Sequence, residues 1–274
     1  MSVKDLLVVL ESAEAADTLG AYAHSLAAAF DAHLTVCGVI AKMPPAPAFL
    51  GEYPFDLVQS VQAAATREIE QAYDKFARAA PKPDGVQLVK IEAAPRAAAE
   101  AVARLARHYD LTIVLQPNAD TGRGDPALVE SVLFHSGRAT IILPFIQKGP
   151  ARLGKIIVAW DGGAAAARAL GCAMPLLKRA GVVEVVTMTG GRSAADLPGV
   201  DVTRHLARHG VSAELKMLPK GEDVGALLLS YAADESADML VMGGYGHSRL
   251  REFVLGGATR TILQTMTLPI FMAH

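Results

Sequence analysis

The 274-residue chain has few aromatic side chains, which make up 5% of it, and two cysteines without a CxxC motif. This composition argues against a disulfide scaffold and against a structural zinc site. A run of about 18 apolar residues is also missing, so we expect no membrane span. The 26 Lys and Arg nearly balance the 28 Asp and Glu, which gives no electrostatic reason for tight nucleic-acid binding. The strand-like first ten residues include Lys4 and Asp5, unlike a secretory signal, so a cytoplasmic location is expected.

What the chain does have is an internal repeat at a shift of about 150 residues. The apolar segment 6–10 aligns with 156–160, and an Ala-rich helical stretch follows each of them. Further strand and amphipathic-helix patterns follow in each half, which ends with an apolar segment, Thr140 to Leu143 or Pro269 to Met272. Each half is therefore predicted to be βαβαβαβαβ.

The strands lack polar alternation and are separated by helices, which is typical of a parallel sheet covered on both faces. We therefore predict an α/β fold of two tandem doubly wound domains, each with a five-stranded parallel sheet. The boundary is expected near residues 147–150, which gives domains 1–148 and 151–274. The first half has a Pro-rich insertion at 43–47, either a stiff connector or a flap over a cleft, and then a long helical pattern from Phe55 to Ala80. The second half is shorter at this point.

Glycines of the second half carry the functional argument. Gly243 and Gly246 follow an apolar strand, and after nine residues Gly256 and Gly257 precede the last predicted helix, Ala258 to Met266. Glycine lets the backbone approach a ligand closely, and N–H groups at a helix start favour an anion such as phosphate. The P-loop and GxGxxG patterns are both missing from this loop. Glycines that merely turn the chain between strand and helix remain the alternative.

The spacing Gly, two residues, Gly, nine residues, Gly resembles the ATP-binding signature of the universal stress protein family. Residues 156–163 and 268–272 are similar to that family as well, and the likeness continues, more weakly, across the first half. The chain looks like a member of this family in which two such domains are fused in tandem. The resemblance implies adenine nucleotide alpha hydrolase-like domains, with ATP bound beyond the carboxyl ends of the strands where the strand order reverses.

The resemblance also implies a set of nucleotide contacts in the second half. Asp161 would bind the ribose or adenine, Thr187 or Met188 would border the adenine, and Met242 and Gly243 would lie beside the ribose and α-phosphate. The phosphates would meet the loop and helix start at Gly246, His247, Arg249, Gly256, Gly257, Ala258 and Thr259. One departure is that Gly257 stands where the signature has Ser or Thr, so one hydroxyl contact is lost.

The first half departs further from this pattern. Gln116 and its neighbours replace the glycine turn, Pro126 and Ala127 replace the glycine pair, and Glu11 stands in the place of Asp161. Because proline has no N–H to offer a phosphate, we expect no nucleotide binding of this kind in the first half.

Other candidates are weaker. His205 and His209 are spaced for zinc but lack the glutamate of HExxH, so a solvated helix face is the alternative. Tyr245 could cover a ligand, and Lys220 could approach one from the rim. Asp161 could also bind magnesium. No catalytic residue is evident, and Cys37 and Cys172 are expected to be small packed residues.

These observations predict a stress-response protein that binds ATP or AMP, with or without Mg, as a regulatory module. A slow ATPase, or an interaction module that has lost its nucleotide, are the alternatives. The last strands of the two halves are expected to pair with each other, since an unpaired edge strand invites a partner. Whether the whole chain also forms a homodimer stays open.

Overall fold

The computed structural model describes residues 2–42, 55–79, 86–118, 124–188, 201–219, 221–244 and 257–274. The first half contains β1 (Asp5–Leu10), α1 (Ala15–Phe30), β2 (His33–Ala41), α2 (Phe55–Arg78), β3 (Val86–Ala93), α3 (Pro95–Ala106), β4 (Leu111–Leu115), α4 (Pro126–His135) and β5 (Ala139–Leu143). The second half contains β6 (Lys155–Ala159), α5 (Ala164–Leu177), β7 (Val182–Met188), α6 (Val202–Arg208), β8 (Ala213–Leu218), α7 (Val224–Asp234), β9 (Met239–Gly243), α8 (Gly257–Thr265) and β10 (Ile270–Ala273). The alternation of strands and helices follows the sequence prediction.

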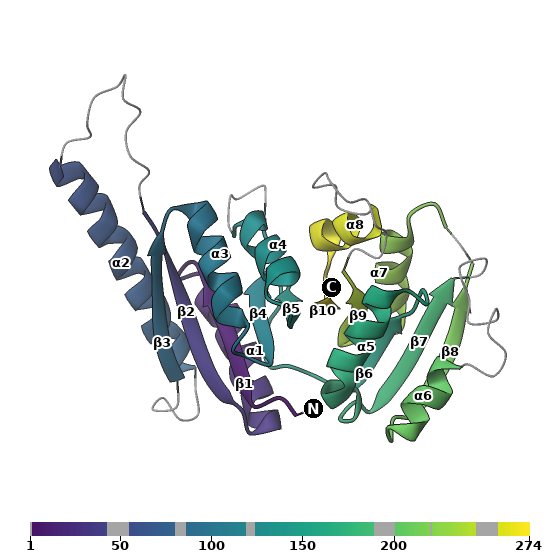
Figure 1. The fold of residues 1–274 in the computed structure, drawn as a ribbon. Coiled ribbons are helices and arrows are strands. Elements are labelled where there is room, and N and C mark those ends of the chain that lie inside the picture. Colours follow the sequence, from purple (N-terminus) through teal and green to yellow (C-terminus); the bar gives the residue numbers. More distant parts are fainter. Residues whose placement is uncertain are drawn as a thin grey trace.

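All the described strands form one ten-stranded sheet in the order β3-β2-β1-β4-β5-β10-β9-β6-β7-β8 (Figure 1). Neighbouring strands are parallel within each half, and each half has the same strand order. The halves join where β5 and β10 pair antiparallel, with Phe271 opposite Ile141. The doubly wound α/β fold and the pairing of the two last strands are thus confirmed.

The core consists of two apolar layers, one on each face of the sheet. Along β1, Leu6 and Val8 lie in one layer, and Leu7 and Val9 lie in the other. Helices α1, α2, α5 and α6 cover the first layer, and α3, α4, α7 and α8 cover the second. Because both faces are covered, the strands need no polar alternation.

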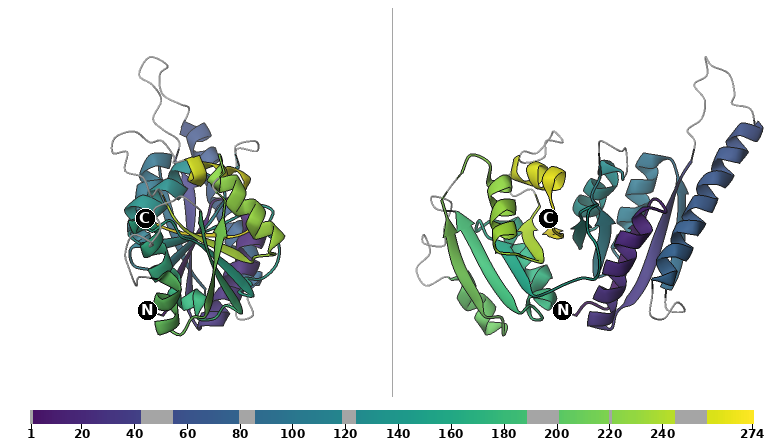
Figure 2. Two further views of the ribbon diagram at one scale, coloured as in Figure 1. Left: turned by 90° about the vertical axis from the view of Figure 1, so that its right-hand side faces the viewer. Right: turned by 180° about the vertical axis from the view of Figure 1, so that it is seen from behind.

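The two halves differ most at α2 and α6. Helix α2 has 24 residues and packs along α1 and β2, whereas α6 has seven. Figure 2 shows α2 along the outer side of the first half. This difference follows the predicted insertion, while the Pro-rich segment 43–47 itself lies outside the described residues.

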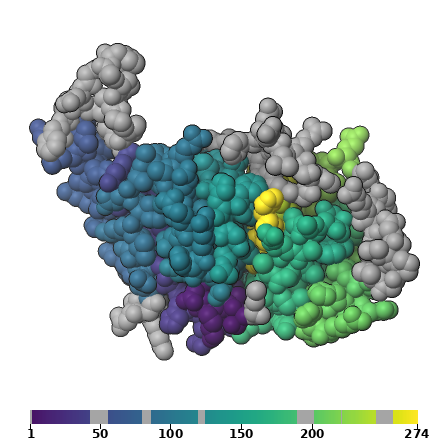
Figure 3. Space-filling model, viewed as in Figure 1, coloured from purple at the N-terminus to yellow at the C-terminus, as the bar shows by residue number. Residues whose placement is uncertain are grey.

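The space-filling view shows the carboxyl-terminal segment, in yellow, between the two halves (Figure 3). Cys37 is buried on β2 and Cys172 is half-buried on α5, as expected. Among the described helices, none combines the length and the apolar composition that crossing a membrane requires.

Candidate functional site

The strand order reverses at two places, between β1 and β4 and between β6 and β9. At such points the connections leave in opposite directions, and the carboxyl ends of the two strands border a crevice. The chain therefore has one candidate site in each half, built from the segments that follow these strands.

In the second half, Asp161 follows β6 and is exposed. Its Oδ1 accepts a hydrogen bond from the backbone N–H of Gly163, 2.8 Å away, just before α5 begins. Gly162 lies between them at φ 74°, a left-handed conformation that favours glycine. This turn holds the carboxylate at the edge of the sheet, where the sequence predicted a nucleoside contact.

The end of β7 contributes Thr187 and Met188, which are both half-buried. Because they are adjacent on a strand, their side chains lie on opposite faces of the sheet. Met242 on β9 is different, since it is 6% exposed and belongs to the apolar layer beneath α7 and α8. Of these residues, Met242 can therefore offer a ligand only its backbone.

Gly243 has a packing reason to be glycine. A Cβ at this position would lie 2.6 Å from the backbone of Ala165 and Ala166, so α5 begins in close contact with the end of β9. The first glycine of the motif is thus required by the fold itself, in line with the alternative that these glycines shape the chain. The packing role and a nucleotide contact by the same backbone are compatible.

The start of α8 is the part of this edge that is open. Gly257 is the first residue of α8, it is exposed, and no atom of the described residues lies within 4 Å of the position of an added Cβ. Ala258 is half-buried, and Thr259 is buried at 4% exposure. The Thr259 side chain therefore faces the protein, which leaves only its backbone for the predicted ligand contact. The helix begins one residue earlier than predicted.

Three contacts that the sequence analysis missed position α8. A Cβ on Gly225 of α7 would lie 2.6 Å from the Ala258 carbonyl oxygen, so glycine allows the two helices to pack closely. The Asp223 carboxylate caps α7 through the Ala226 N–H at 3.0 Å and accepts a hydrogen bond from the Thr261 hydroxyl at 2.9 Å. The sequence signal for this close helix packing was Gly225, a single glycine within a helical pattern.

The third contact comes from the first half. Gln116, which is 1% exposed and follows β4, donates from Nε2 to the Leu263 carbonyl oxygen near the end of α8, at 2.8 Å. The last carbonyls of a helix lack partners within the helix, so this side chain caps α8 from the other half of the chain. Nothing in the local sequence indicates a contact across 147 positions.

Part of the predicted site lies outside the described residues. These residues are Gly246, His247, Arg249 and Gly256 of the glycine loop, together with Tyr245 and Lys220. Their part in binding stays a prediction.

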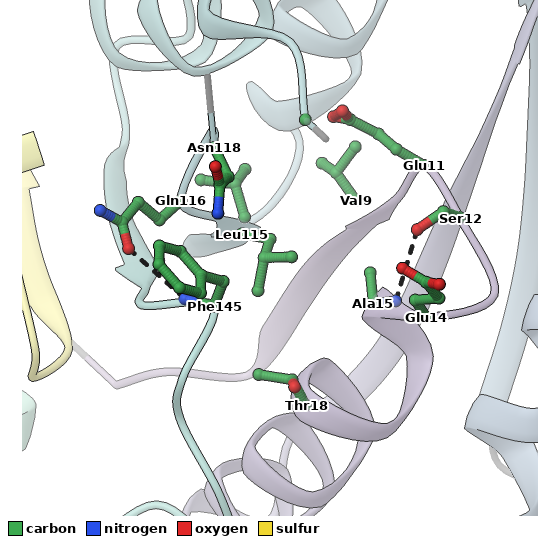
Figure 4. Close-up of a pocket in the computed structure, with 12 residues that line it drawn as sticks. Val9, Glu11, Ser12, Glu14, Ala15, Thr18, Leu115, Gln116, Asn118 and Phe145 are labelled. Carbon is green, nitrogen blue, oxygen red and sulfur yellow. Dashed lines mark hydrogen bonds between the residues drawn. The ribbon is translucent and has the colours of Figure 1, made fainter. Parts of the chain in front are cut away.

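The first-half crevice is a pocket at the ends of β1 and β4 (Figure 4). Glu11, Asn118 and Phe145 line it, and Figure 4 shows Glu11 and Asn118 on opposite sides of the space. Glu14, Ser12 and Thr18 border it as well, and none of the described residues that line this pocket is cationic. The two carboxylates make the pocket unfavourable for phosphate groups.

The start of α4 has little left to offer an anion. Glu11 Oε2 accepts the Asp125 N–H at 2.9 Å, Pro126 has no N–H, and the Ala127 N–H donates to Asp125 Oδ1 at 2.9 Å. The Leu128 N–H donates to the Asp125 carbonyl oxygen at 3.0 Å. A carboxylate of the protein thus takes the position that phosphate favours at a helix start.

Burial raises the pKa of Glu11 to about 7, against the lowering effect of the Asp125 N–H bond, and the Asp125 charge raises it further. In the unfolded chain the pKa of a glutamate is about 4.3. The folded state therefore loses stability as the pH rises from about 4.3 through 7, because the buried carboxylate must ionise.

We expect Glu11→Gln to stabilise the protein by about 1–2 kcal/mol at pH 8 and to have little effect near pH 4.5. The amide oxygen can still accept the Asp125 N–H, while the cost of the buried charge is removed. Urea unfolding across this pH range measures the effect, with Glu100→Gln on the exposed part of α3 as the control. A variant as pH-dependent as the wild type would contradict this account.

Two other candidates do not form sites. His205 and His209 are exposed on and after α6, with ring centroids 4.7 Å apart. Within the described ranges, no group of three or more His, Cys, Asp or Glu is arranged to hold a metal ion. The histidine pair therefore matches the solvated helix face weighed above.

The doubly wound halves define an α/β fold of the type in which ligands bind at the carboxyl ends of the strands where the strand order reverses. Residues 153–274 match the Universal stress protein family. The Universal stress protein Slr1230 of Synechocystis sp. (strain ATCC 27184 / PCC 6803 / Kazusa) is 37% identical over 43 residues. That match spans 16% of this chain and 15% of the relative. The carboxyl-terminal half of this chain therefore contains a domain that matches the universal stress protein family.

Solved structures extend the likeness in fold to the whole chain. A universal stress protein from Archaeoglobus fulgidus DSM 4304 has a TM-score of 0.70 at 14% identity, covering 99% of this chain and 96% of its own. A putative universal stress protein from Pseudomonas aeruginosa UCBPP-PA14 has a TM-score of 0.55 at 16% identity, covering 99% and 93%. At these identities the likeness concerns the fold alone.

Proposed function

We propose that residues 151–274 form a domain that binds one adenine nucleotide, ATP or AMP, at the carboxyl ends of β6 and β9. The observation that carries this proposal is the start of α8, which is exposed and free of contacts from the described residues, at the edge of the sheet where the strand order reverses. Free N–H groups and the helix dipole favour phosphate at such a position. Asp161 then lies at the end of the neighbouring strand β6, where it receives the ribose or adenine.

The glycine loop completes the proposed site. His247 and Arg249 bring positive charge or hydrogen-bond donors to the phosphates, and Gly246 and Gly256 let the backbone approach them. Among the described residues proposed for this site, Asp161 is the carboxylate available for Mg, so we expect few protein ligands to a metal that arrives with ATP. One carboxylate is few for phosphoryl-transfer chemistry, which supports a binding and regulatory role over fast turnover.

The first half, residues 1–148, is proposed to be a domain that has lost this site and reports on its occupancy. Its crevice is closed to phosphate by Glu11, and its Gln116 caps the helix whose other end meets the phosphates. Nucleotide binding at Gly257 therefore acts on a helix that both halves hold. The protein is proposed to work in the cytoplasm as a stress-response signalling module, with a homodimer as a further level of assembly.

Small molecules released from freshly purified protein test this function. We expect an adenine nucleotide in the wild type and none after a bulky substitution at Gly246 or Gly256. Lack of nucleotide, together with no thermal shift on adding ATP, would leave the interaction module as the better account. Steady ADP production that disappears in Asp161→Ala would favour the ATPase.

Gly257→Ser is expected to bind ATP about threefold to tenfold more tightly than the wild type. The variant restores the hydroxyl of the family signature, and an ordinary hydrogen bond contributes about 0.5–1.5 kcal/mol. Gly257 is a helical residue of α8 and no atom of the described residues lies within 4 Å of an added Cβ, so serine is expected to fit there. Titration calorimetry measures the change, with Gly257→Ala as the control that adds a side chain without a hydroxyl. Equal affinity in the two variants would contradict the phosphate contact.

A further inference from the structure

The strand β8 lies at one end of the ten-stranded sheet, so its neighbour among the described strands, β7, is on one side of it (Figure 1). The backbone N–H and C=O groups on the outer side of such an edge strand can pair with a further strand. The chain already joins its two halves in this way, because β5 and β10 pair antiparallel. The outer edge of β8 can therefore accept a strand in the same manner.

The two outer strands of the sheet, β3 and β8, differ in how well helices cover their apolar side chains. In the first half, Leu88 of β3 packs against the first layer, which the long helix α2 covers. In the second half, Leu215 of β8 lies opposite Val185 of the same layer, but α6 has only seven residues. Along this face of β8, Ala213 is half-buried, Leu215 is 44% exposed and Met217 is 61% exposed. We call Leu215 and Met217 the β8 strip.

The other face of β8 carries one charge of each sign. Glu214 and Lys216 alternate with the apolar residues, and their side chains are 67% and 36% exposed. Lys216 Nζ donates to Glu214 Oε1 within the strand, at 2.7 Å. The two charges thus lie at equal distances on either side of Leu215. A strand with this pattern is complementary to an antiparallel copy of itself.

We propose that β8 pairs antiparallel with β8 of a second copy of this chain, with Leu215 opposite Leu215. In this register Glu214 of each copy lies opposite Lys216 of the other, and such cross-strand pairs of opposite charge are stabilising. Met217 lies opposite Ala213 of the second copy, which packs beside α6 of that copy. Opposite residues of antiparallel strands share one face of the sheet, so the β8 strips of the two copies meet.

The charges also select this register over its neighbours. A slip of two residues places Glu214 opposite Glu214 or Lys216 opposite Lys216, and like charges directly opposite each other are destabilising. A slip of one residue places Leu215 opposite a charged residue. Because both copies use the same surface, the assembly closes as a dimer rather than growing into a filament.

This dimer goes beyond the proposed nucleotide function and assigns the homodimer to a surface. It joins the second halves of the two copies, so their sheets become continuous across β8. The pairing requires no nucleotide. An experiment without nucleotide can therefore overturn the dimer while leaving nucleotide binding untouched.

Sedimentation velocity of the full chain without nucleotide tests the proposal. We expect the wild type to show a concentration-dependent equilibrium between monomer and dimer. Glu214→Lys and Lys216→Glu each place like charges opposite each other at two points, so each is expected to raise the dissociation constant of the dimer about tenfold. The double variant that carries both substitutions restores opposite charges, and we expect it to dimerise like the wild type.

Met217→Glu tests the β8 strip and is expected to weaken the dimer about tenfold as well. Val61→Glu is the matched control, because Val61 is 41% exposed on α2, away from β8, and its substitution should leave dimerisation unchanged. A wild type that stays monomeric over the whole concentration range would overturn the proposal. A dimer that persists in both single charge variants, or that the double variant does not restore, would overturn it too, since the contact would lie elsewhere.

Discussion

Lys155→Ala is expected to lower the free energy of unfolding by about 2–3 kcal/mol. Lys155 Nζ contacts Glu184 Oε1 at 2.8 Å and also pairs with Glu235, while the Tyr231 hydroxyl donates to Glu184 Oε2 at 2.9 Å. The Glu184 side chain is 6% exposed and that of Lys155 is 18% exposed. Removing the lysine leaves a buried carboxylate without its cation. The expected loss stays below the range for fully buried pairs because Lys155 retains contact with water.

The pH range of this effect follows from the two ionised groups. Burial raises the pKa of Glu184, but hydrogen bonds from Lys155 and Tyr231 lower it more, so the net shift is downward. Burial lowers the pKa of Lys155, and its bonds to Glu184 and Glu235 outweigh that effect, so the net shift is upward. The pair therefore stabilises the fold above the unfolded glutamate pKa of about 4.3 and below the unfolded lysine pKa of about 10.4.

Urea unfolding of Lys155→Ala at pH 7 measures the loss. Lys216→Ala is the matched control, because Lys216 pairs with Glu214 at 2.7 Å but the Glu214 side chain is 67% exposed. Exposed pairs contribute little, so the control should unfold almost like the wild type. If both variants lose the same free energy of unfolding, the burial of Glu184 does not cause the loss in Lys155→Ala.

Gly225→Ala is expected to destabilise the second half by about 1–3 kcal/mol. It is also expected to weaken ATP binding about tenfold. The added Cβ meets the Ala258 carbonyl oxygen at 2.6 Å and Thr261 Cβ at 3.0 Å, so α8 must move away from α7. Because α8 begins at Gly257, this movement displaces the proposed phosphate-binding end. Unfolding and calorimetry on the same variant separate the two effects.

Gly171→Ala is the control for this substitution. Gly171 lies within α5 and has no atom of the described residues within 4 Å of an added Cβ, so alanine there should stabilise the helix by about 0.5–1 kcal/mol. Normal ATP affinity in Gly225→Ala would show that the position of α8 does not determine binding.

The internal repeat made the fold predictable. Continuous apolar segments such as Leu6 to Leu10 report directly on burial, and a pattern that occurs twice also predicts that the two halves share one strand order. The pairing of the last strands followed from the family resemblance and from the need to cover an edge. These signals are local or repeated, and both kinds can be read from a sequence.

The contacts that hold the site were harder to predict. Gln116 and Leu263 are 147 positions apart, and their bond depends on how the two halves pack. Gly225 stood within an ordinary amphipathic pattern, and only the approach of α8 shows why it is glycine. Met242 and Thr259 were assigned to the ligand because of their position in the motif, but their burial is decided by the face each presents to the core.

A native mass-spectrometry titration of the full chain with ATP tests the central claim most directly, because it counts bound nucleotides. The proposed loss of the first-half site and retention of the second predict that the spectrum saturates at one ATP per chain. Two ATP per chain would contradict the role given to Glu11 and Pro126, and none at saturating ATP would contradict the nucleotide site itself.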